Sequence, residues 1–245
     1  MVTAALTYDG VPAPVLAERL GVPHLALYAR VGSTLDVAHR LAEDGAPSGT
    51  LVLADTQDAG RGRQGRAWAS PPGHGIWLAM IRRAPESGVL ALRVGLAVAD
   101  TLDALGATVR LKWPNDVLLA GAKLAGILCE ARSGRAPWVA IGVGLNVTGP
   151  PPVPHAATLH QAVPGADRVG VLLGLVPRVL AMSTHAALTA AECAAWAARD
   201  ALAGCDVMAP VLGRAAGIAP DGALLVMTPD GERRILSGTV TCSSR

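Results

Sequence analysis

The most informative absences in this 245-residue sequence concern aromatic and basic side chains. There is no phenylalanine, and there are only two tyrosines. Single-stranded nucleic acids are usually held by stacking of bases on aromatic rings. The net charge of +2 also gives little attraction to a phosphate backbone. An RNA- or anion-binding module is therefore a weak interpretation of the chain.

Other absences limit where the protein is expected to be located and which metal sites it is expected to have. No apolar stretch reaches about 18 residues without a charge or a proline, so we expect no membrane span. The N-terminus lacks a basic region followed by an apolar segment, so the expected location is the cytoplasm. The four cysteines lie far apart, and the six histidines are scattered. We therefore expect no metal site built from these residues.

Lysine and asparagine are nearly absent as well. The only lysines are Lys112 and Lys123, and the only asparagines are Asn115 and Asn146. Three of these four residues lie within twelve positions of one another. A lysine ammonium is a compact charge that arginine does not replace at a tight site. This clustering predicts a functional site near residues 112–123.

A glycine- and arginine-rich stretch runs from Gln57 to Trp68. Its three glycines alternate with three arginines, in the order Gly60, Arg61, Gly62, Arg63, Gly65 and Arg66. Glycine lets a ligand approach the backbone closely, and guanidinium groups bind carboxylate and phosphate through a planar fork of donors. The stretch predicts a loop that closes over an anion.

The hydrophobic pattern predicts an α+β fold with a mixed, largely antiparallel sheet and packed helices, because short strands follow one another through short turns. Strands are expected at 28–31, 50–56, 76–81, 109–113, 117–119, 124–131 and 138–147, with turns at 114–116 and at 121–122. Helices are expected at 33–45, 87–106, 169–187 and 190–201, and a short one around 15–20. Two Pro-Asp-Gly turns, at 220–222 and 229–231, predict a small antiparallel barrel after about residue 204.

Several common catalytic patterns are missing. Gly60 to Gly65 fits the spacing G-x-G-x-x-G, but charged residues and two prolines follow it. A dinucleotide fold would place an apolar helix there. The sequence also has no phosphate-binding P-loop and no G-x-S-x-G nucleophile motif.

Four segments, in order, resemble the biotin protein ligase family. They are Gln57–Arg66, Lys112-Trp113-Pro114-Asn115-Asp116, Lys123-Leu124-Ala125-Gly126-Ile127-Leu128 and Ile141-Gly142-Val143-Gly144-Leu145-Asn146. The resemblance runs from about Ser33 to Val147, and the C-terminal barrel also fits it. The sequence departs from the family pattern at Leu35, where an asparagine commonly follows Ser-Thr, so only a backbone contact is expected at that position.

The resemblance implies a class II synthetase-like catalytic domain at residues 1–202 and an SH3-like barrel at 203–245. It implies that the carboxylate of biotin attacks ATP, with Mg²⁺ bound to the phosphates, to give biotinyl-5′-AMP. A lysine of the biotin carboxyl carrier domain of acetyl-CoA carboxylase then receives the biotin. Residues 1–28 are too short for a winged-helix domain, so we expect no DNA partner. A homodimer is possible.

The resemblance also assigns roles to residues. Catalysis is expected from Lys123, Arg61, Arg63 and Asp116. Biotin is expected to contact Ser33, Thr34, Leu35, Gln57, Arg61, Gly62, Arg63, Lys123 and Gly126. ATP and the adenylate are expected to contact Gly60, Arg63, Arg66, Trp68, Lys112, Asn115 and Asn146.

Simpler interpretations of several residues remain open. Ser33 and Thr34 also suit a helix N-cap, and Trp68 also suits the core. Asn115, Asn146 and Asp116 also suit structural roles in turns. For the whole chain, the alternatives are a lipoate–protein ligase-like acyl-adenylate transferase and a biotin-sensing or anion-binding regulatory module.

Overall fold

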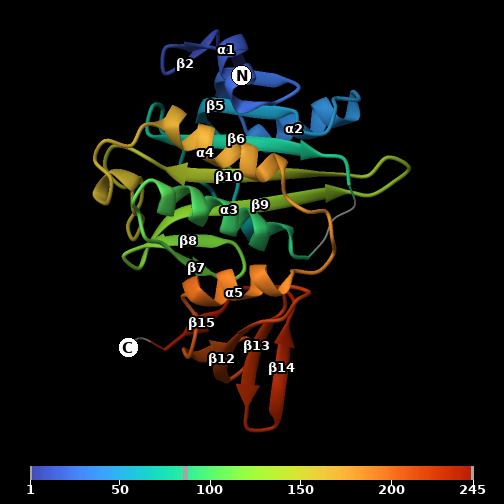
Figure 1. The fold of residues 1–245 in the computed structure, drawn as a ribbon, viewed down its shortest axis with the longest axis vertical. Helices are drawn as coiled ribbons and strands as arrows, with labels where there is room; N and C mark the ends of the chain where they lie inside the picture. The colour runs from blue at the N-terminus through green and yellow to red at the C-terminus, as the bar shows by residue number, and fades with distance from the viewer. Residues whose placement is uncertain (1, 85–87, 244–245) are drawn as a thin grey trace.

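An eight-stranded mixed sheet runs through the middle of the protein (Figure 1). The computed structural model describes residues 2–84 and 88–243. The strand order is β1 (Thr3–Ala4), β4 (Leu25–Val31), β5 (Leu51–Gln57), β6 (Gly75–Arg82), β10 (Trp138–Asn146), β9 (Ala122–Arg132), β8 (Asp116–Leu119) and β7 (Arg110–Lys112). Among the described residues only the β4–β5 pair is parallel, which confirms the predicted, largely antiparallel sheet.

Alternating side chains of the sheet pack into two separate cores. Leu51 and Leu53 of β5 join a large core with α1 (Ala13–Leu20), α3 (Leu90–Ala104) and α4 (Arg168–Leu180). Val52 and Ala54 of the same strand join a smaller core with α2 (Thr34–Glu43). Neighbouring residues of a strand point to opposite faces, so the helices cover both sides of the sheet.

The N-terminal residues add a short hairpin of β2 (Thr7–Tyr8) and β3 (Val11–Pro12). Its turn residue Asp9 pairs with Arg168 at the start of α4, and Arg168 Nη1 also lies 2.6 Å from Asp55 Oδ1 on β5. The Arg168 guanidinium lies 4.4 Å above the ring of Tyr8. This buried cation thus fastens the N-terminal hairpin to the central sheet.

Most predicted elements are present, with ends that differ by a few residues. The expected start of α3 at Ser87 lies outside the described residues, and the helix is described from Leu90 to Ala104. The turn predicted at 121–122 lies at Ala120 and Gly121, both with positive φ. Lys123 therefore belongs to strand β9.

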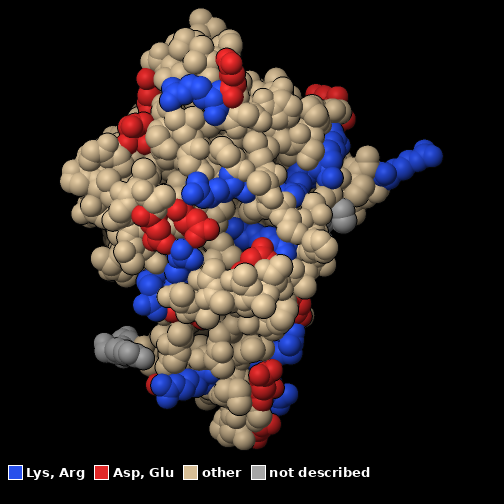
Figure 2. Space-filling model, viewed as in Figure 1, with Lys and Arg blue, Asp and Glu red and all other residues tan. Residues whose placement is uncertain are grey.

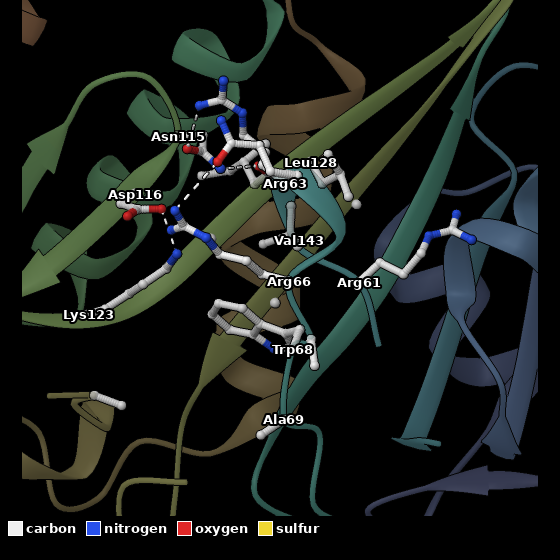
Figure 3. A pocket seen from close by; sticks show the side chains of 18 of the residues that line it. Arg61, Arg63, Arg66, Trp68, Ala69, Asn115, Asp116, Lys123, Leu128 and Val143 are labelled. Carbon is white, nitrogen blue, oxygen red and sulfur yellow. Dashed lines mark hydrogen bonds and ion pairs between the residues drawn. The ribbon is translucent and has the colours of Figure 1, made fainter. Parts of the chain in front are cut away.

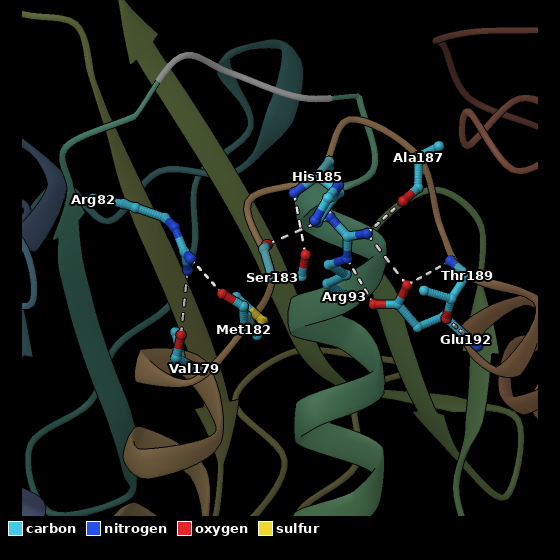
Figure 4. A network of polar contacts seen from close by, with 9 residues as sticks. All are labelled: Arg82, Arg93, Val179, Met182, Ser183, His185, Ala187, Thr189 and Glu192. Atoms are coloured by element: carbon cyan, nitrogen blue, oxygen red, sulfur yellow. Dashed lines mark hydrogen bonds and ion pairs between the residues drawn. The ribbon is translucent and has the colours of Figure 1, made fainter.

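The predicted helix 169–187 was wrong at its C-terminal end, because α4 stops at Leu180. After α4 the chain follows an irregular path around the buried Arg93 of α3 (Figure 4). Its guanidinium donates to the carbonyls of Ser183, His185 and Ala187. It also pairs with Glu192 on α5 (Ala190–Arg199), at 2.6 Å between Nε and Oε1. Carbonyls bound in this way are not free to continue a helix.

The C-terminal residues form a five-stranded antiparallel sheet. Its order is β14 (Gly231–Ile235), β13 (Leu224–Thr228), β12 (Gly213–Ile218), β11 (Asp206–Ala209) and β15 (Thr241–Cys242). The pairings of the described residues leave this sheet open, so its closure into a barrel and the boundary at 202/203 stay predictions. The sheet attaches below α5 (Figure 1), where Trp113 Nε1 donates to Gly222 O at 2.9 Å.

Two further observations describe the surface and the helices. On the face in Figure 2, basic and acidic side chains lie in small interspersed groups. None of the helices within residues 2–84 and 88–243 has both the length and the apolar character that a membrane crossing requires.

Candidate active site

A cavity of about 410 Å³ lies between the central sheet and the segment 57–68. Fifteen of the sequence-predicted site residues line it, which brings together parts of the chain from Ser33 to Asn146. They are Ser33, Thr34, Leu35, Gln57, Arg61, Gly62, Arg63, Arg66, Trp68, Lys112, Asn115, Asp116, Lys123, Gly126 and Asn146. Figure 3 shows the labelled part of this cavity.

The segment 57–68 is a small hairpin with a tight tip. Trp68 N donates to Gly60 O at 2.8 Å, and Gly62 N donates to Arg66 O at 2.7 Å. Arg61 and Ala67 form a single antiparallel bridge between these two bonds. The tip is the 3₁₀ turn η1 (Arg63–Gly65), in which Gln64 has a φ of 57°. We call residues 57–68 the arginine hairpin.

Gly60 is the predicted site residue that lies outside this lining, and it has a different role. A Cβ atom at Gly60 would lie only 2.5 Å from Trp68 O. Real Cβ atoms do not come so close to a carbonyl oxygen, so glycine is needed where the two arms of the hairpin meet.

The floor of the cavity is made by glycines on two strands. The indole of Trp68 lies against Gly144 of β10 and Gly126 of β9. Added Cβ atoms at these glycines would lie 2.4 Å and 2.9 Å from the ring. Leu35 packs against the third glycine of this floor, Gly142, and is buried. The absence of side chains at these positions therefore lets the Trp68 indole and Leu35 pack directly on the sheet, where they form the lining of the cavity.

One end of the cavity is ionic. Lys123 Nζ lies 2.7 Å from Asp116 Oδ1, and it is also 5.3 Å from the centre of the Trp68 ring. Arg63 Nη1 donates to Asn115 Oδ1 at 3.3 Å. Burial lowers the pKa of Arg63, the charge of Asp116 opposes that shift, and nearby Arg66 adds to it. These groups gather positive charge beside one carboxylate.

The other end is neutral and hydrogen-bonding. Gln57 Oε1 accepts from Thr34 N at 2.9 Å and from Thr34 Oγ1 at 3.1 Å. Gln57 Nε2 donates to Ser70 Oγ at 2.8 Å. Ser33 is the N-cap residue of α2, yet its side chain makes no capping bond. A capping role therefore does not account for the Ser33 hydroxyl.

Several buried polar atoms of the lining have no hydrogen-bond partner among the described residues. They are Ser33 Oγ, Arg61 Nε, Trp68 Nε1 and Asn146 Oδ1. Buried polar atoms are nearly always hydrogen-bonded, because leaving one unpaired costs about 1–3 kcal/mol. Their position on one cavity indicates a ligand with several polar groups.

Arg61 and Arg66 leave the hairpin in different directions. Arg61 extends away from Arg63 and Lys123 in Figure 3 and pairs with Asp36 and Glu130. The exposed Arg66 extends toward Asp116 and Lys123 in Figure 3, and its Nη2 donates to Gln64 Oε1 at 3.4 Å. Asn115 and Asn146 hold backbone, since their Nδ2 atoms donate to Ile127 O and Ala157 O. Lys112 lines the cavity.

The sequence analysis missed two lining segments. Residues 152–156 follow β10 and are anchored by Lys123, whose backbone N donates to His155 O at 3.0 Å. Residues 238–240 come from the C-terminal sheet, and Thr239 Oγ1 lies 3.3 Å from Gln64 Oε1 at the tip of the hairpin. The proline run at 150–154 was a visible signal for the first segment. The second has no local signal, because only the folded chain brings it to the cavity.

The donor set of the cavity suits an acid activated through phosphate. Across the described residues, His, Cys, Asp and Glu side chains form no group of three or more that could hold a metal ion. The ionic end can neutralise phosphate or carboxylate, and the neutral end can satisfy an uncharged polar group. Between them lies the flat floor.

Comparisons with known proteins agree with the family resemblance of the sequence motifs. The biotin/lipoate A/B protein ligase family model matches residues 27–146, and the biotin protein ligase C-terminal domain model matches residues 209–241. The bifunctional ligase/repressor BirA of Bacillus subtilis is 36% identical over 240 residues, which cover 89% of this chain and 73% of that protein. The biotin–[acetyl-CoA-carboxylase] ligase of Mycobacterium tuberculosis is 40% identical over 164 residues, covering 61% and 60%.

A solved structure agrees with the fold. The biotin protein ligase from Aquifex aeolicus, in complex with biotin and ATP, superposes with a TM-score of 0.76 at 28% sequence identity. The match covers 91% of this chain and 100% of that one. The two family models therefore cover segments that fold together here around one cavity.

Proposed function

This chain belongs to the biotin protein ligase family, and we propose that it activates biotin with ATP and transfers it to a lysine of a carrier protein. The observation that carries the proposal is the composition of the cavity. Unpaired Ser33 Oγ and the Thr34–Gln57 pair lie at one end, and Lys123, Arg63 and Asp116 lie at the other. A vitamin with a neutral ureido ring and a carboxylate tail matches these two ends.

In the first step, a carboxylate oxygen of biotin attacks the α-phosphorus of ATP. The new O–P bond gives biotinyl-5′-AMP, and the bond to the β-phosphate breaks to release pyrophosphate. Negative charge gathers on the phosphate during this step, so fixed cations lower the barrier. Lys123 and Arg63 are suited to this role, because both line the cavity and both lie near Asp116 rather than in open solvent.

Magnesium enters this scheme as part of the substrate MgATP. Mg²⁺ prefers oxygen ligands and keeps several waters when phosphates hold it. Asp116, the carboxylate at the ionic end, is already paired with Lys123. Phosphate oxygens and water are therefore expected to supply most of the ligands of Mg²⁺.

In the second step, the ε-amine of the carrier lysine attacks the acyl carbon, and AMP leaves. An amine must lose its proton to attack. When Lys123 turns to the phosphate, Asp116 becomes free to accept that proton or to orient the amine. The carrier that fits this proposal best is the biotin carboxyl carrier domain of acetyl-CoA carboxylase, which the name of the Mycobacterium tuberculosis relative suggests.

Exchange of labelled pyrophosphate into ATP tests the first step directly. We expect exchange that requires biotin and is not supported by lipoate, because Ser33 and the Gln57–Thr34 pair suit a polar ring. Equal exchange with lipoate would favour the lipoate ligase alternative. Absence of exchange with both acids would reject the proposed activity. Addition of the carrier domain should then yield one biotinylated lysine.

A further inference from the structure

The side chain of Arg61 connects the neck of the arginine hairpin to two other elements. Its Nη1 pairs with Asp36 in the first turn of α2, and its Nη2 lies 2.8 Å from Glu130 Oε2 on β9. Glu130 is the more buried of the two carboxylates, with 23% of its side chain exposed against 53% for Asp36. Glu130 is therefore the stronger anchor, because its charge is less screened by water.

The buried His39 holds Glu130 in turn, and the partly buried Trp138 holds His39. His39 Nε2 lies 3.0 Å from the same Glu130 oxygen, and Trp138 Nε1 lies 3.1 Å from His39 Nδ1. An indole N–H can only donate, so His39 Nδ1 is the acceptor and Nε2 carries the hydrogen toward Glu130. The histidine is buried between α2 and the sheet. Trp138 therefore donates to His39, and His39 and Arg61 both donate to Glu130, so one hydrogen-bonded series links Trp138 to the hairpin.

The rest of the arginine hairpin has few anchors beyond its base. Its tip and returning arm, residues 64–67, are exposed. The contacts of the tip with the rest of the protein are long, at 3.3 Å from Arg63 to Asn115 and 3.3 Å from Thr239 to Gln64. Segments with few buried contacts open at low free-energy cost. The charged pair at Arg61 is therefore well placed to decide how often the hairpin covers the cavity.

We propose that Trp138, His39 and Glu130 act as positioning residues that fix Arg61 and so hold the arginine hairpin over the bound substrate. The inference rests on the proposed function, since the substrate is biotin. These residues do not touch the reacting atoms. They act through Arg61, whose hairpin carries Arg63 and Trp68 on the cavity side.

The kinetic test compares Glu130→Ala, Arg61→Ala and the double variant in biotin-dependent pyrophosphate exchange. Each single variant should raise the KM for biotin about tenfold, because the hairpin is held less firmly over the bound biotin. It should leave kcat within about twofold, because the groups that take part in the chemical step are unchanged. The double variant should be no worse than Arg61→Ala, because Glu130 acts through Arg61. Multiplying effects in the double variant would overturn the proposal, as would an unchanged KM in Glu130→Ala.

Rescue and a matched control separate positioning from general stability. Glu130→Asp keeps the charge and should recover part of the biotin KM. Asp58→Asn removes a carboxylate from an exposed pair with Arg30 at the base of the same hairpin, and should leave the KM unchanged. A rise in KM equal to that of Glu130→Ala would contradict the specific role of Glu130.

Limited trypsin digestion tests the inference without any activity. Trypsin cleaves after arginine, and the hairpin offers Arg63 and Arg66 next to exposed residues. Cleavage there should be about tenfold faster in Glu130→Ala and His39→Ala than in Asp58→Asn. Cleavage at the wild-type rate overturns the positioning role even if exchange activity is normal. Absence of exchange in the wild type, with faster cleavage in the variants, would instead reject the proposed function alone.

Discussion

At the residue scale, Lys123 and Asp116 form the ion pair on which the proposed chemistry depends. The pair is 2.7 Å long, with 38% and 26% of the side chains exposed. Both side chains face the cavity in Figure 3, and Trp68 lies beneath the ammonium. A pair in this position can separate when an anion arrives, which gives the two residues different roles in the two steps.

Lys123→Ala tests the first of these roles. The variant removes the cation beside the developing negative charge, so transition-state stabilisation should fall by about 2 kcal/mol or more. This loss corresponds to at least roughly a 30-fold lower kcat/KM in pyrophosphate exchange. Lys112→Ala is the control, because it removes the other lysine of the cavity and keeps Lys123. An equal effect of both variants would contradict a special role for Lys123.

Asp116→Asn tests the second role. The amide keeps the shape but cannot accept a proton from the carrier lysine. We expect transfer to the carrier to slow by about 10²–10⁴-fold, while pyrophosphate exchange changes little. Single-turnover transfer from preformed biotinyl-AMP is the measurement. Transfer at the wild-type rate would leave Asp116 with only its ion-pair role.

The sequence predicted which residues meet at the cavity better than where each side chain points. The scarcity of lysine singled out Lys123 without any structure. It could not show that Arg61 and Arg63 diverge, because that depends on the tight tip, where Gln64 has a positive φ. Ser33 was ambiguous for a similar reason, since only the fold shows that its hydroxyl makes no cap.

At the element scale, the glycines of β9 and β10 are as important as the charged residues. A strand normally covers its face with side chains, but Gly126 and Gly144 leave backbone exposed to the indole of Trp68. The run of apolar segments joined by short turns predicted these strands. They did not predict that the glycines would form the floor of a cavity, because that requires the hairpin to fold back onto the sheet.

Gly144→Ala should disrupt this floor. The added Cβ would lie 2.4 Å from the Trp68 ring, so the indole or the strand must shift. Overpacking of this kind costs about 1–3 kcal/mol, which would weaken biotinyl-AMP binding roughly 5- to 150-fold. Gly142→Ala is the matched control, since its nearest neighbour is the end of the Leu35 side chain at 3.1 Å. Calorimetric titration should show a much larger loss for Gly144→Ala.

At the scale of the whole molecule, segments far apart in sequence complete the site and hold the helices. Residues 238–240 reach the cavity from the C-terminal sheet. Arg93 joins α3 to α5 and to the connection between α4 and α5 (Figure 4). The sequence predicted a continuous helix there, because the apolar pattern carries no sign of a buried arginine that binds carbonyls. Local sequence patterns do not predict such long-range contacts.

Arg93→Met should destabilise the fold strongly and change its pH dependence. Removal of this buried cation leaves Glu192 and several carbonyls unpaired, a loss of about 3–5 kcal/mol in the free energy of unfolding at pH 7. The hydrogen bond from Arg93 is the largest of the effects that lower the Glu192 pKa below its ordinary value of 4.5. A lowered carboxyl pKa stabilises the fold above the unfolded pKa and loses that contribution as pH falls through the folded pKa.

Urea unfolding of wild type and Arg93→Met should therefore show a stability difference that is largest above about pH 4.5 and narrows at lower pH. Arg30→Met, which breaks an exposed ion pair, serves as the control and should change little. A difference that grows as the pH falls would show that the sign of this linkage is wrong.

The central claim is that one cavity holds biotinyl-5′-AMP between its neutral and ionic ends. A crystal structure of this protein with that intermediate is the most direct test. The ureido ring should hydrogen-bond to Ser33 and the Thr34–Gln57 pair, and the acyl phosphate should lie beside Lys123 and Arg63. Density for the intermediate at any other place, with Lys123 still paired to Asp116, would contradict the account.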